Sequence, residues 1–268
     1  MLYLYILVSI AILLLIYMRI ETTLLEVTRV SFTQNKDSLK VMQLSDIHIN
    51  RLFVTPERIK QVIEAEKPDI ILMTGDYIEY KRHIPKFLKF LNRLGPNQNF
   101  YLCLGNHDYE AFKADPKGLQ QYIELIEATG VNILHNRSTC FEKNFKLYNI
   151  VGIADMRYKL HRIDEALQGC NPDALMNIGF SHNPDIVLEV PQQKLDYLFC
   201  GHFHGGQIWA PFDFEFRLLR REKLCKKGIK SGLHKVNGVN LYINRGLGNV
   251  SLPLRFLSRP EITIFQLP

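Results

Sequence analysis

Side chains that bind metal ions or transfer protons recur along this sequence, each directly after a short apolar run. In chain order they are Asp46, His48, Asp76, Asn106, His107, Asp108, His182, His202 and His204. Taken singly, Asp76 after Gly75 and Asn106 after Gly105 have an ordinary explanation as turn residues. Mixed nitrogen and oxygen donors suit Mn, Fe, Zn or Co better than an all-oxygen Mg or Ca site. The ordered set therefore predicts a metal site.

The apolar runs that precede these residues predict buried strands. They lie at residues 39–44, 69–74, 100–104, 147–153, 177–180 and 195–200, with further strands expected at 240–244 and 261–267. Amphipathic stretches of helical period separate several of them, at residues 56–66, 84–94, 119–128 and 163–167. This alternation predicts a layered α/β domain with largely parallel strands. Because the carboxyl ends of parallel strands form one crevice, the metal-binding side chains are expected to converge there.

Five short motifs carry a resemblance to the calcineurin-like metallophosphoesterase superfamily. They are DIH at 46–48, GD at 75–76, GNHD at 105–108, SH at 181–182 and GHFHGG at 201–206. The resemblance runs from about residue 40 to the end of the sequence. Residues 201–207, 245–248 and 253–262 are similar to the YaeI/YkuE-type, membrane-associated bacterial branch. The implied fold is a four-layer αββα sandwich over residues 39–268.

The resemblance also implies a role for each residue of the motifs. Two divalent ions would be bound, one by Asp46, His48 and His204 and the other by Asn106, His182 and His202, with Asp76 bridging them. Two such ions activate water and neutralise charge that develops on phosphoryl oxygens. His107 is the candidate to donate a hydrogen bond or proton to the substrate, with Asp108 fixing its tautomer. A purely structural strand-end pair is the alternative for these two.

Residues 1–18 are almost wholly apolar, interrupted only by Ser9, and Arg19 closes the run. A helix of this length would span roughly 27 Å, enough for a thin bilayer core. No Lys or Arg precedes the run and no small-residue cleavage site follows it, so a cleaved signal peptide is disfavoured. A soluble core helix would have a polar face, which is absent. We predict a single-pass anchor at residues 1–20, with residues 21–38 as a connecting segment.

Charge and cysteine usage predict a cytoplasmic catalytic domain. Positive residues follow the anchor at Arg19, Arg29, Lys36 and Lys40, and cytoplasmic flanks are enriched in such charges. The five cysteines are odd in number and widely spaced, which is typical of reduced thiols.

A basic segment and neighbouring aromatic residues bear on the choice of substrate. The formal net charge is +6, and basic residues gather at 217, 220, 221, 223, 226, 227, 230 and 235. Trp209, Phe212, Phe214 and Phe216 directly precede this cluster. Such a mixture is expected where rings meet lipid headgroups and cations meet phosphate, although rings packed on the core beneath a charged rim would look the same.

The sequence after Asp76 excludes two substrate classes by comparison with the superfamily. Protein phosphatases continue as GDxxDRG, whereas here the chain reads GDYIEYK at 75–81. Purple acid phosphatases carry a tyrosine ligand where this chain has Glu79. The basic segment would suit nucleic acid, but the anchor and the aromatic residues make such a partner unexpected.

An anchored site predicts an amphiphilic or nucleotide-linked phosphorylated substrate at the bilayer. The branch is similar to the calcineurin-like UDP-2,3-diacylglucosamine pyrophosphatases of lipid A biosynthesis, which gives the specific prediction. A general phosphodiesterase with another membrane or nucleotide substrate, and a non-catalytic membrane-bound scaffold, are the alternatives. The sequence specifies neither the native metal nor the oligomeric state.

Overall fold

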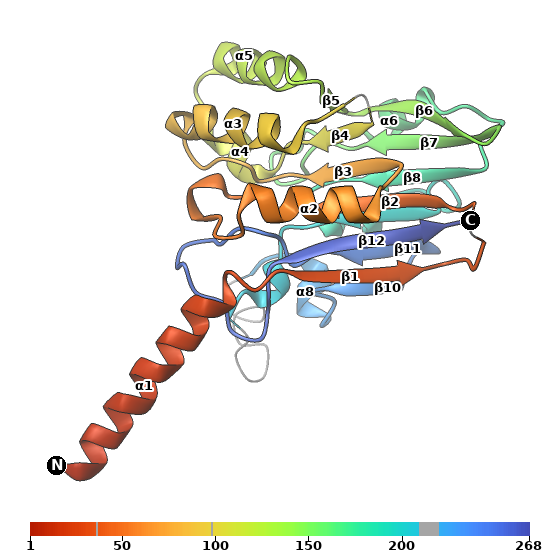
Figure 1. Cartoon of the computed structure of the whole chain (residues 1–268). Coiled ribbons are helices and arrows are strands. Elements are labelled where there is room, and N and C mark those ends of the chain that lie inside the picture. Colours follow the sequence, from red (N-terminus) through yellow and green to blue (C-terminus); the bar gives the residue numbers. More distant parts are fainter. Residues whose placement is uncertain (36, 98, 209–219) are drawn as a thin grey trace.

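Two six-stranded sheets form the centre of the molecule (Figure 1). The computed structural model describes residues 1–268 apart from 36, 98 and 209–219. The first sheet has the order β1-β12-β2-β3-β4-β5. Its strands are β1 (Glu26–Ser31), β12 (Glu261–Leu267), β2 (Leu39–Leu44), β3 (Ile70–Thr74), β4 (Phe100–Cys103) and β5 (Asn132–Ile133). Strands β2 to β5 are parallel, so their carboxyl ends lie at one edge.

The second sheet has the order β10-β11-β9-β8-β7-β6. Its strands are β10 (Gly232–Val236), β11 (Val239–Ile243), β9 (Tyr197–Cys200), β8 (Met176–Phe180), β7 (Lys146–Gly152) and β6 (Arg137–Lys143). Strands β7, β8, β9 and β11 are parallel, and an antiparallel partner closes each side, β6 on β7 and β10 on β11.

Period-two alternation along the strands divides the core into separate layers. In β2, Val41 belongs to the cluster between the two sheets, whereas Met42 belongs to the cluster beneath the helices. In β3, Leu72 and Ile71 divide in the same way. Because both faces of the sheet are covered, the strands appear in the sequence as unbroken apolar runs.

Helices cover the outer face of each sheet, which confirms the predicted αββα sandwich. On the first sheet they are α2 (Pro56–Glu66), α3 (Ile84–Leu94) and α5 (Pro116–Glu127). On the second they are α6 (Ile163–Gln168), α8 (Lys223–Lys226) and the 3-10 helix η3 (Pro184–Leu188). A short helix α4 (Asn106–Ala111) begins at the end of β4. The apolar and amphipathic runs thus correspond closely to strands and helices.

The predicted connecting segment at residues 21–38 requires a correction, because it contains β1. This strand pairs in parallel with β12, from Glu26 opposite Glu261 to Ser31 opposite Gln266. It lies at the edge of the sheet and is only partly buried, so its sequence lacks an apolar run. Thr28 also donates a hydrogen bond to Glu261. The segment is therefore part of the sandwich.

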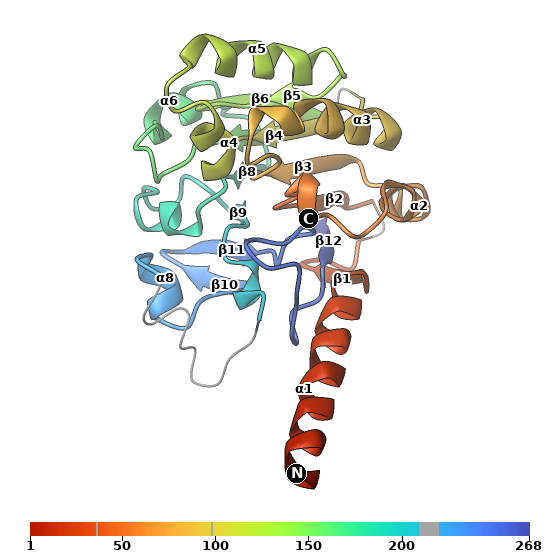
Figure 2. The ribbon, with the colours of Figure 1, turned by 90° about the vertical axis from the view of Figure 1, so that its left-hand side faces the viewer.

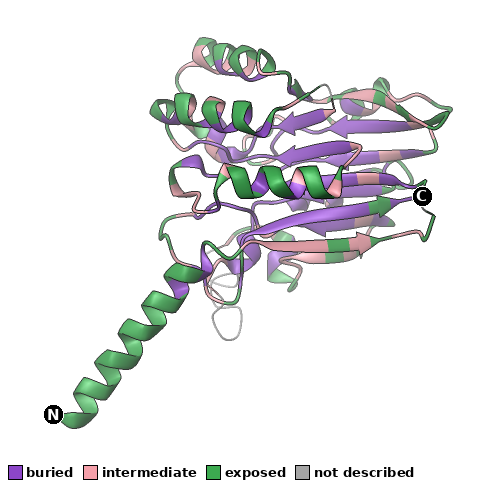
Figure 3. Ribbon diagram, in the orientation of Figure 1, coloured by how far each residue is buried: buried purple, intermediate pink, exposed green. Residues whose placement is uncertain are grey.

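Helix α1 (Leu2–Glu21) projects from the edge of the sandwich toward which β3 and β4 point (Figure 1). It is exposed along its length apart from Met18 and Glu21 (Figure 3). Among the described residues it is the one helix long and apolar enough to cross a membrane. The strand ends and α1 therefore lie on the same side of the molecule (Figure 2).

Removing a ring from between the sheets is expected to destabilise the fold strongly. Phe199 is 1% exposed and its ring centroid lies 4.3 Å from that of Phe265 on the opposite sheet. Phe199→Ala should lower the free energy of unfolding by about 3–5 kcal/mol, measured by urea unfolding in detergent. Phe145→Ala is the control, because that ring is 96% exposed. Equal effects of the two substitutions would contradict this description of the core.

Candidate metal centre

The side chains predicted to bind metal converge at one edge of the sandwich. They follow β2 (Asp46 and His48), β3 (Asp76), β4 (Asn106), β8 (His182) and β9 (His202 and His204), and all are buried. Both sheets contribute, because their parallel strands end on the same side. The sequence predicts this convergence, because residues that directly follow parallel strands lie at the same edge of a sheet.

The backbone at these strand ends is held in a conformation that non-glycine residues rarely adopt. The φ angle is 48° at Asp46, 38° at His48, 59° at Asp76, 74° at His202 and 52° at His204. Each such residue costs on the order of 1 kcal/mol and persists only where the surrounding structure enforces it. These turns direct the side chains back toward the crevice. The strained backbone thus lowers the stability of the fold but places the metal-binding side chains together.

The acidic and imidazole groups form two clusters whose ligand atoms lie within 4.8 Å of one another. The first contains Asp46, His48 and His204, with His204 Nε2 3.2 Å from Asp46 Oδ1. The second contains Asp76, His182 and His202.

The carboxylate of Asp76 lies between the two clusters. Its Oδ2 is 3.1 Å from His182 Nε2 and 3.8 Å from His48 Nε2. Asn106 joins the second cluster through its Oδ1, 3.2 Å from His182 Nε2. The arrangement offers two sites that share one carboxylate.

Hydrogen bonds on the far side of two imidazoles determine which atoms face the second cluster. His182 Nδ1 lies 2.9 Å from the carbonyl oxygen of Thr74, an acceptor, so Nδ1 carries the proton of the neutral ring. His202 Nε2 lies 2.9 Å from a carboxylate oxygen of Glu222, so its proton is on Nε2. His182 Nε2 and His202 Nδ1 then face each other with lone pairs at 3.1 Å.

These lone pairs fit divalent cations with nitrogen and oxygen ligands. His182 Nε2, His202 Nδ1, Asp76 Oδ2 and Asn106 Oδ1 can all act as electron-pair donors to a cation. His48 Nε2 is buried without a hydrogen-bond partner among the described residues, which ordinarily costs about 1–3 kcal/mol. Bound cations would satisfy the facing lone pairs of the second cluster and the unpartnered His48 Nε2, so the residues present fit the two ions that the family implies.

Charge interactions shift the pKa values of the clustered groups. Burial lowers the pKa of His182, but the carboxylates of Asp76 and Asp46 outweigh this and raise it to about 10. Burial raises the pKa of Asp46, but His204 holds it well below its usual range. Without metal, positive charge is therefore favoured in the centre, where protons would compete with cations.

Two carboxylates on the outside of the centre were not predicted as part of it. Glu222 accepts a hydrogen bond from His202, and Glu79 Oε1 lies 3.3 Å from His48 Nδ1. A carboxylate hydrogen-bonded to a ligating histidine, as Glu222 is, fixes its tautomer and raises its basicity, whereas Glu79 contributes negative charge beside His48. Glu79 lies three residues after Asp76, and the sequence pattern indicated only that this position does not carry a tyrosine ligand. Glu222 lies within a basic run, where the sequence provides no signal.

Asp155 is a further acidic residue near the centre that the sequence analysis missed. It is fully buried, and its Oδ2 has no hydrogen-bond partner among the described residues. Burial raises its pKa, while His182 and His202 act in the opposite direction. Asp155 follows β7 directly after Ala154, so the strand-end criterion that identified the others would also have found it.

His107 lines the cleft above the clusters. Its backbone N–H donates to Asp76 Oδ1 at 2.8 Å, and its ring centroid is 5.2 Å from that of His48. Burial lowers the pKa of His107, which favours the neutral ring. A neutral imidazole at this position can donate one hydrogen bond into the cleft.

Asp108 has a different set of partners from those predicted. Its two oxygens accept hydrogen bonds from the backbone N–H groups of Gly105, Asp76, Tyr77 and Ile78, at 2.9–3.1 Å. The expected contact that fixes the tautomer of His107 is absent from the hydrogen bonds of the described residues. Helix α4 turns the Asp108 side chain away from its neighbour and toward the turn after β3. Asp108 thus positions the bridging Asp76.

An open cleft of about 990 Å³ lies over the two clusters. Asp76, Asn106, His107, His202 and His204 form part of its floor, and its rim carries Arg157, Arg220 and Arg221. Cationic side chains around such a floor favour anionic ligands. The predicted aromatic residues Trp209, Phe212, Phe214 and Phe216, with Arg217, lie outside the described residues.

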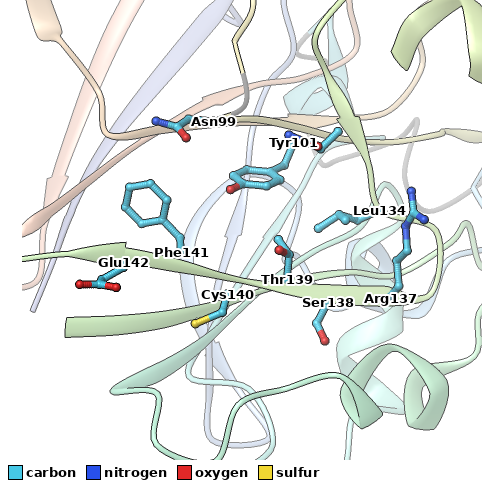
Figure 4. A pocket seen from close by; sticks show the side chains of 10 residues that line it. Asn99, Tyr101, Leu134, Arg137, Ser138, Thr139, Cys140, Phe141 and Glu142 are labelled. Carbon is cyan, nitrogen blue, oxygen red and sulfur yellow. The ribbon is translucent and has the colours of Figure 1, made fainter. Parts of the chain in front are cut away.

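A second hollow, of about 610 Å³, lies between β4, β5 and β6 (Figure 4). Asn99, Tyr101, Thr139 and Cys140 are among the residues that line it. It shares no lining residue with the metal cleft, and neither metal-binding cluster of the described residues lies in it. The chemistry therefore belongs to the cleft at the strand ends.

The chain belongs to the calcineurin-like phosphoesterase family, whose model matches residues 39–206. It is 33% identical to the metallophosphoesterase YkoQ of Bacillus subtilis over 87% of this chain and 84% of that relative. It is 27% identical to the phosphodiesterase YaeI of Escherichia coli, over 88% and 84% of the two chains. It is 28% identical to the UDP-2,3-diacylglucosamine pyrophosphatase LpxG of Chlamydia trachomatis, over 92% and 90%. The predicted family and the hydrolase class are confirmed.

Loss of the Glu222 carboxylate should weaken metal binding. Glu222→Ala removes the acceptor that holds the His202 proton on Nε2, so we expect roughly a 10- to 100-fold loss in metal affinity. Glu222→Gln should recover part of this, because its amide oxygen still accepts the hydrogen bond. Titration of the metal-free protein with Mn measures both. Glu189→Ala is the control, since Glu189 pairs with His161 outside the cleft. Unchanged affinity in Glu222→Ala would refute the role of Glu222.

Substitution of Asp108 should destabilise the turn that carries Asp76. Asp108→Asn replaces an acceptor oxygen with an amide donor that faces backbone N–H groups, so we expect a loss of about 2–3 kcal/mol in the free energy of unfolding. Bound metal should fall as well, measured by elemental analysis of the purified protein. The exposed Asp173→Asn provides the control. Wild-type stability and metal content in Asp108→Asn would show that the carboxylate does not support the turn.

Proposed function

We propose that this protein hydrolyses a phosphodiester or pyrophosphate bond at a membrane surface, with UDP-2,3-diacylglucosamine as its specific substrate. The observation that supports it best is the convergence of buried lone pairs beneath a cleft with an arginine rim. Asp46, His48 and His204 would hold one divalent ion. Asn106, His182 and His202 would hold the other, with Asp76 shared. Such a pair of ions supplies activated water and stabilises charge on the phosphoryl group.

The chain's own side chains have separate tasks in this reaction. The neutral ring of His107 faces the cleft and is suited to donate a hydrogen bond to a leaving or nonbridging oxygen. Asp108 keeps the turn of Asp76 in place through four backbone N–H groups. Arg157 and Arg221 on the rim suit the second phosphate of a pyrophosphate. Together these residues position the bond and neutralise its charge.

The proposed substrate rests on similarity and on the membrane anchor. The relative LpxG, aligned over most of both chains, is named for this pyrophosphatase activity. Helix α1 would hold the catalytic domain, which includes β1 (Glu26–Ser31) as well as residues 39–268, beside a bilayer. The positive residues after α1 favour a cytoplasmic domain, the compartment in which nucleotide-linked lipids are made.

Two alternatives have distinct supporting observations. The relative YaeI is named a phosphodiesterase, which favours a general activity on another membrane or nucleotide substrate. A non-catalytic scaffold would have no need for this buried group of electron-pair donors. The intact set of ligand-type residues therefore favours an enzyme.

Product analysis distinguishes these possibilities. The protein, purified in detergent with Mn added, is offered UDP-2,3-diacylglucosamine and, separately, bis-p-nitrophenyl phosphate. We expect UMP release that depends on metal and is lost in His202→Ala, because that substitution removes one of the cation's ligands. Cleavage of only the model diester would reject the substrate and retain the enzyme class. Bound metal without turnover of either compound would favour the scaffold.

A further inference from the structure

The end of helix α1 is fastened to a loop formed by residues 250–258, here called the β11–β12 loop. Glu21, which is 1% exposed, accepts hydrogen bonds from the backbone N–H groups of Leu257 and Ser258 at 3.1 and 3.0 Å. The N–H of Arg255 donates to the carbonyl oxygen of Met18 at 3.0 Å. A buried carboxylate that accepts backbone hydrogen bonds is a rigid connection. The helix is therefore docked on the domain.

This docking places the loop beside the last turn of the apolar span. Met18 is the final residue of that span, and the ring of Tyr17 contacts the ring of Phe256 edge-on, with centroids 6.1 Å apart. Figure 2 shows the loop extending along α1 toward its amino-terminal half. If α1 crosses a bilayer, this loop lies at the depth of the lipid headgroups.

The loop presents apolar side chains at this depth. Leu252 is 55% exposed and Leu257 is 59% exposed. Leucine side chains are favourable where a polypeptide enters the interface between headgroups and acyl chains. The bilayer that contains α1 is the environment that would cover them.

The same loop forms one wall of a hollow beside the metal cleft. This hollow has a volume of about 340 Å³ and is lined by Ile208, Val250, Leu252 and His204, with Arg220 at its side. His204, Val250 and Arg220 also line the metal cleft, so the two spaces adjoin. An apolar hollow next to a phosphoryl site suits a substrate with an acyl chain.

Buried hydrogen bonds tie the loop to the metal-binding residues. The fully buried guanidinium of Arg255 donates to the carbonyl oxygens of Ser258, Gly246 and Gly248. Ser258 Oγ donates to the carbonyl oxygen of His204 at 2.8 Å. The N–H of Gly248 in turn donates to the carbonyl oxygen of Asp46. The loop is thereby fixed to both the anchor and the metal centre.

We propose that the β11–β12 loop is a second membrane contact, which Glu21 fixes relative to the anchor. The hollow beside His204 then opens at the bilayer surface, and a lipid-linked substrate reaches the metal centre without leaving the membrane. The inference rests on the proposed function in taking α1 as a membrane anchor. A flexible tether would instead let the domain and its cleft take any orientation.

Fluorescence quenching tests the contact in the full-length chain. The exposed Cys140 and the half-buried Cys170 are replaced by Ser, which leaves only buried native cysteines, and an introduced cysteine at Leu257 carries an environment-sensitive dye. Vesicles of phosphatidylethanolamine and phosphatidylglycerol contain lipids with a nitroxide at the headgroup or on the acyl chain. We expect quenching of the dye at 257 and none at Phe145, a 96% exposed control site. Equal fluorescence loss at both sites, or no loss at 257, would overturn the proposal.

One further label and two variants separate failure of the inference from failure of the proposed function. A dye at Leu7, inside α1, reports on the anchor alone, so no quenching there rejects the anchor itself. Quenching at 7 without quenching at 257 rejects only the second contact. Glu21→Ala should reduce quenching at 257 and leave it intact at 7, whereas the exposed control Glu64→Ala should change neither. Unchanged quenching at 257 in Glu21→Ala would reject the role of Glu21.

Turnover gives an independent readout. Leu257→Asp should leave hydrolysis of soluble bis-p-nitrophenyl phosphate unchanged, because Leu257 lines neither the cleft nor the hollow. Hydrolysis of UDP-2,3-diacylglucosamine embedded in vesicles should fall by roughly tenfold relative to that of the soluble diester. Equal rates on vesicles for wild type and Leu257→Asp would overturn the proposal. Absence of vesicle turnover in the wild type rejects the substrate, and the quenching result then decides the contact.

Discussion

Electron-pair donors that face one another in a buried space are the constraint on which the strand-end site depends. His182 Nε2 and His202 Nδ1 lie 3.1 Å apart, and an oxygen of Asp76 lies 3.1 Å from the former. In the absence of a metal ion such a group of donors favours a proton instead, because the carboxylates of Asp76 and Asp46 raise the pKa of His182. The strained backbone at Asp46 and His48 costs stability. A two-sheet core with helices on both outer faces supplies the stability that makes the site possible.

Two buried charges hold the turns on either side of this site, and each is satisfied by the backbone. Asp108 accepts hydrogen bonds from N–H groups of the turn after β3, and Arg255 donates to the carbonyl oxygens of Gly246, Gly248 and Ser258. Peptide groups are plentiful and well placed in tight turns, so a single charged side chain can organise several residues at once. Asp108 positions the bridging Asp76 in this way. Arg255 positions the strand-end Asp46 through Gly248, whose N–H donates to the carbonyl oxygen of Asp46.

The mode of attachment to α1 gives the cleft a fixed relation to that helix, and to a bilayer if the helix spans one. Glu21 at the end of the helix and Ser258 beside His204 belong to one continuous set of hydrogen bonds. Only two residues at the carboxyl-terminal end of α1 are buried by the domain, so a few contacts determine its direction. An amphiphilic substrate and the docked helix would then share the same surface, which suits chemistry on a headgroup while the acyl chains stay in lipid.

The sequence by itself determined the layered α/β architecture, the anchor-like helix and the identity of the residues that converge. Apolar runs report strands buried on both faces, and a polar residue after such a run marks the strand end. It missed β1, β6 and β10, because these edge strands are partly exposed and have no apolar run. Only the tertiary structure decided that Glu222 and Glu79 support His202 and His48, and that Asp108 holds a turn instead of its neighbour. These contacts depend on how turns that are distant in sequence meet and on the direction in which each side chain points. Local residue pattern and spacing predict neither.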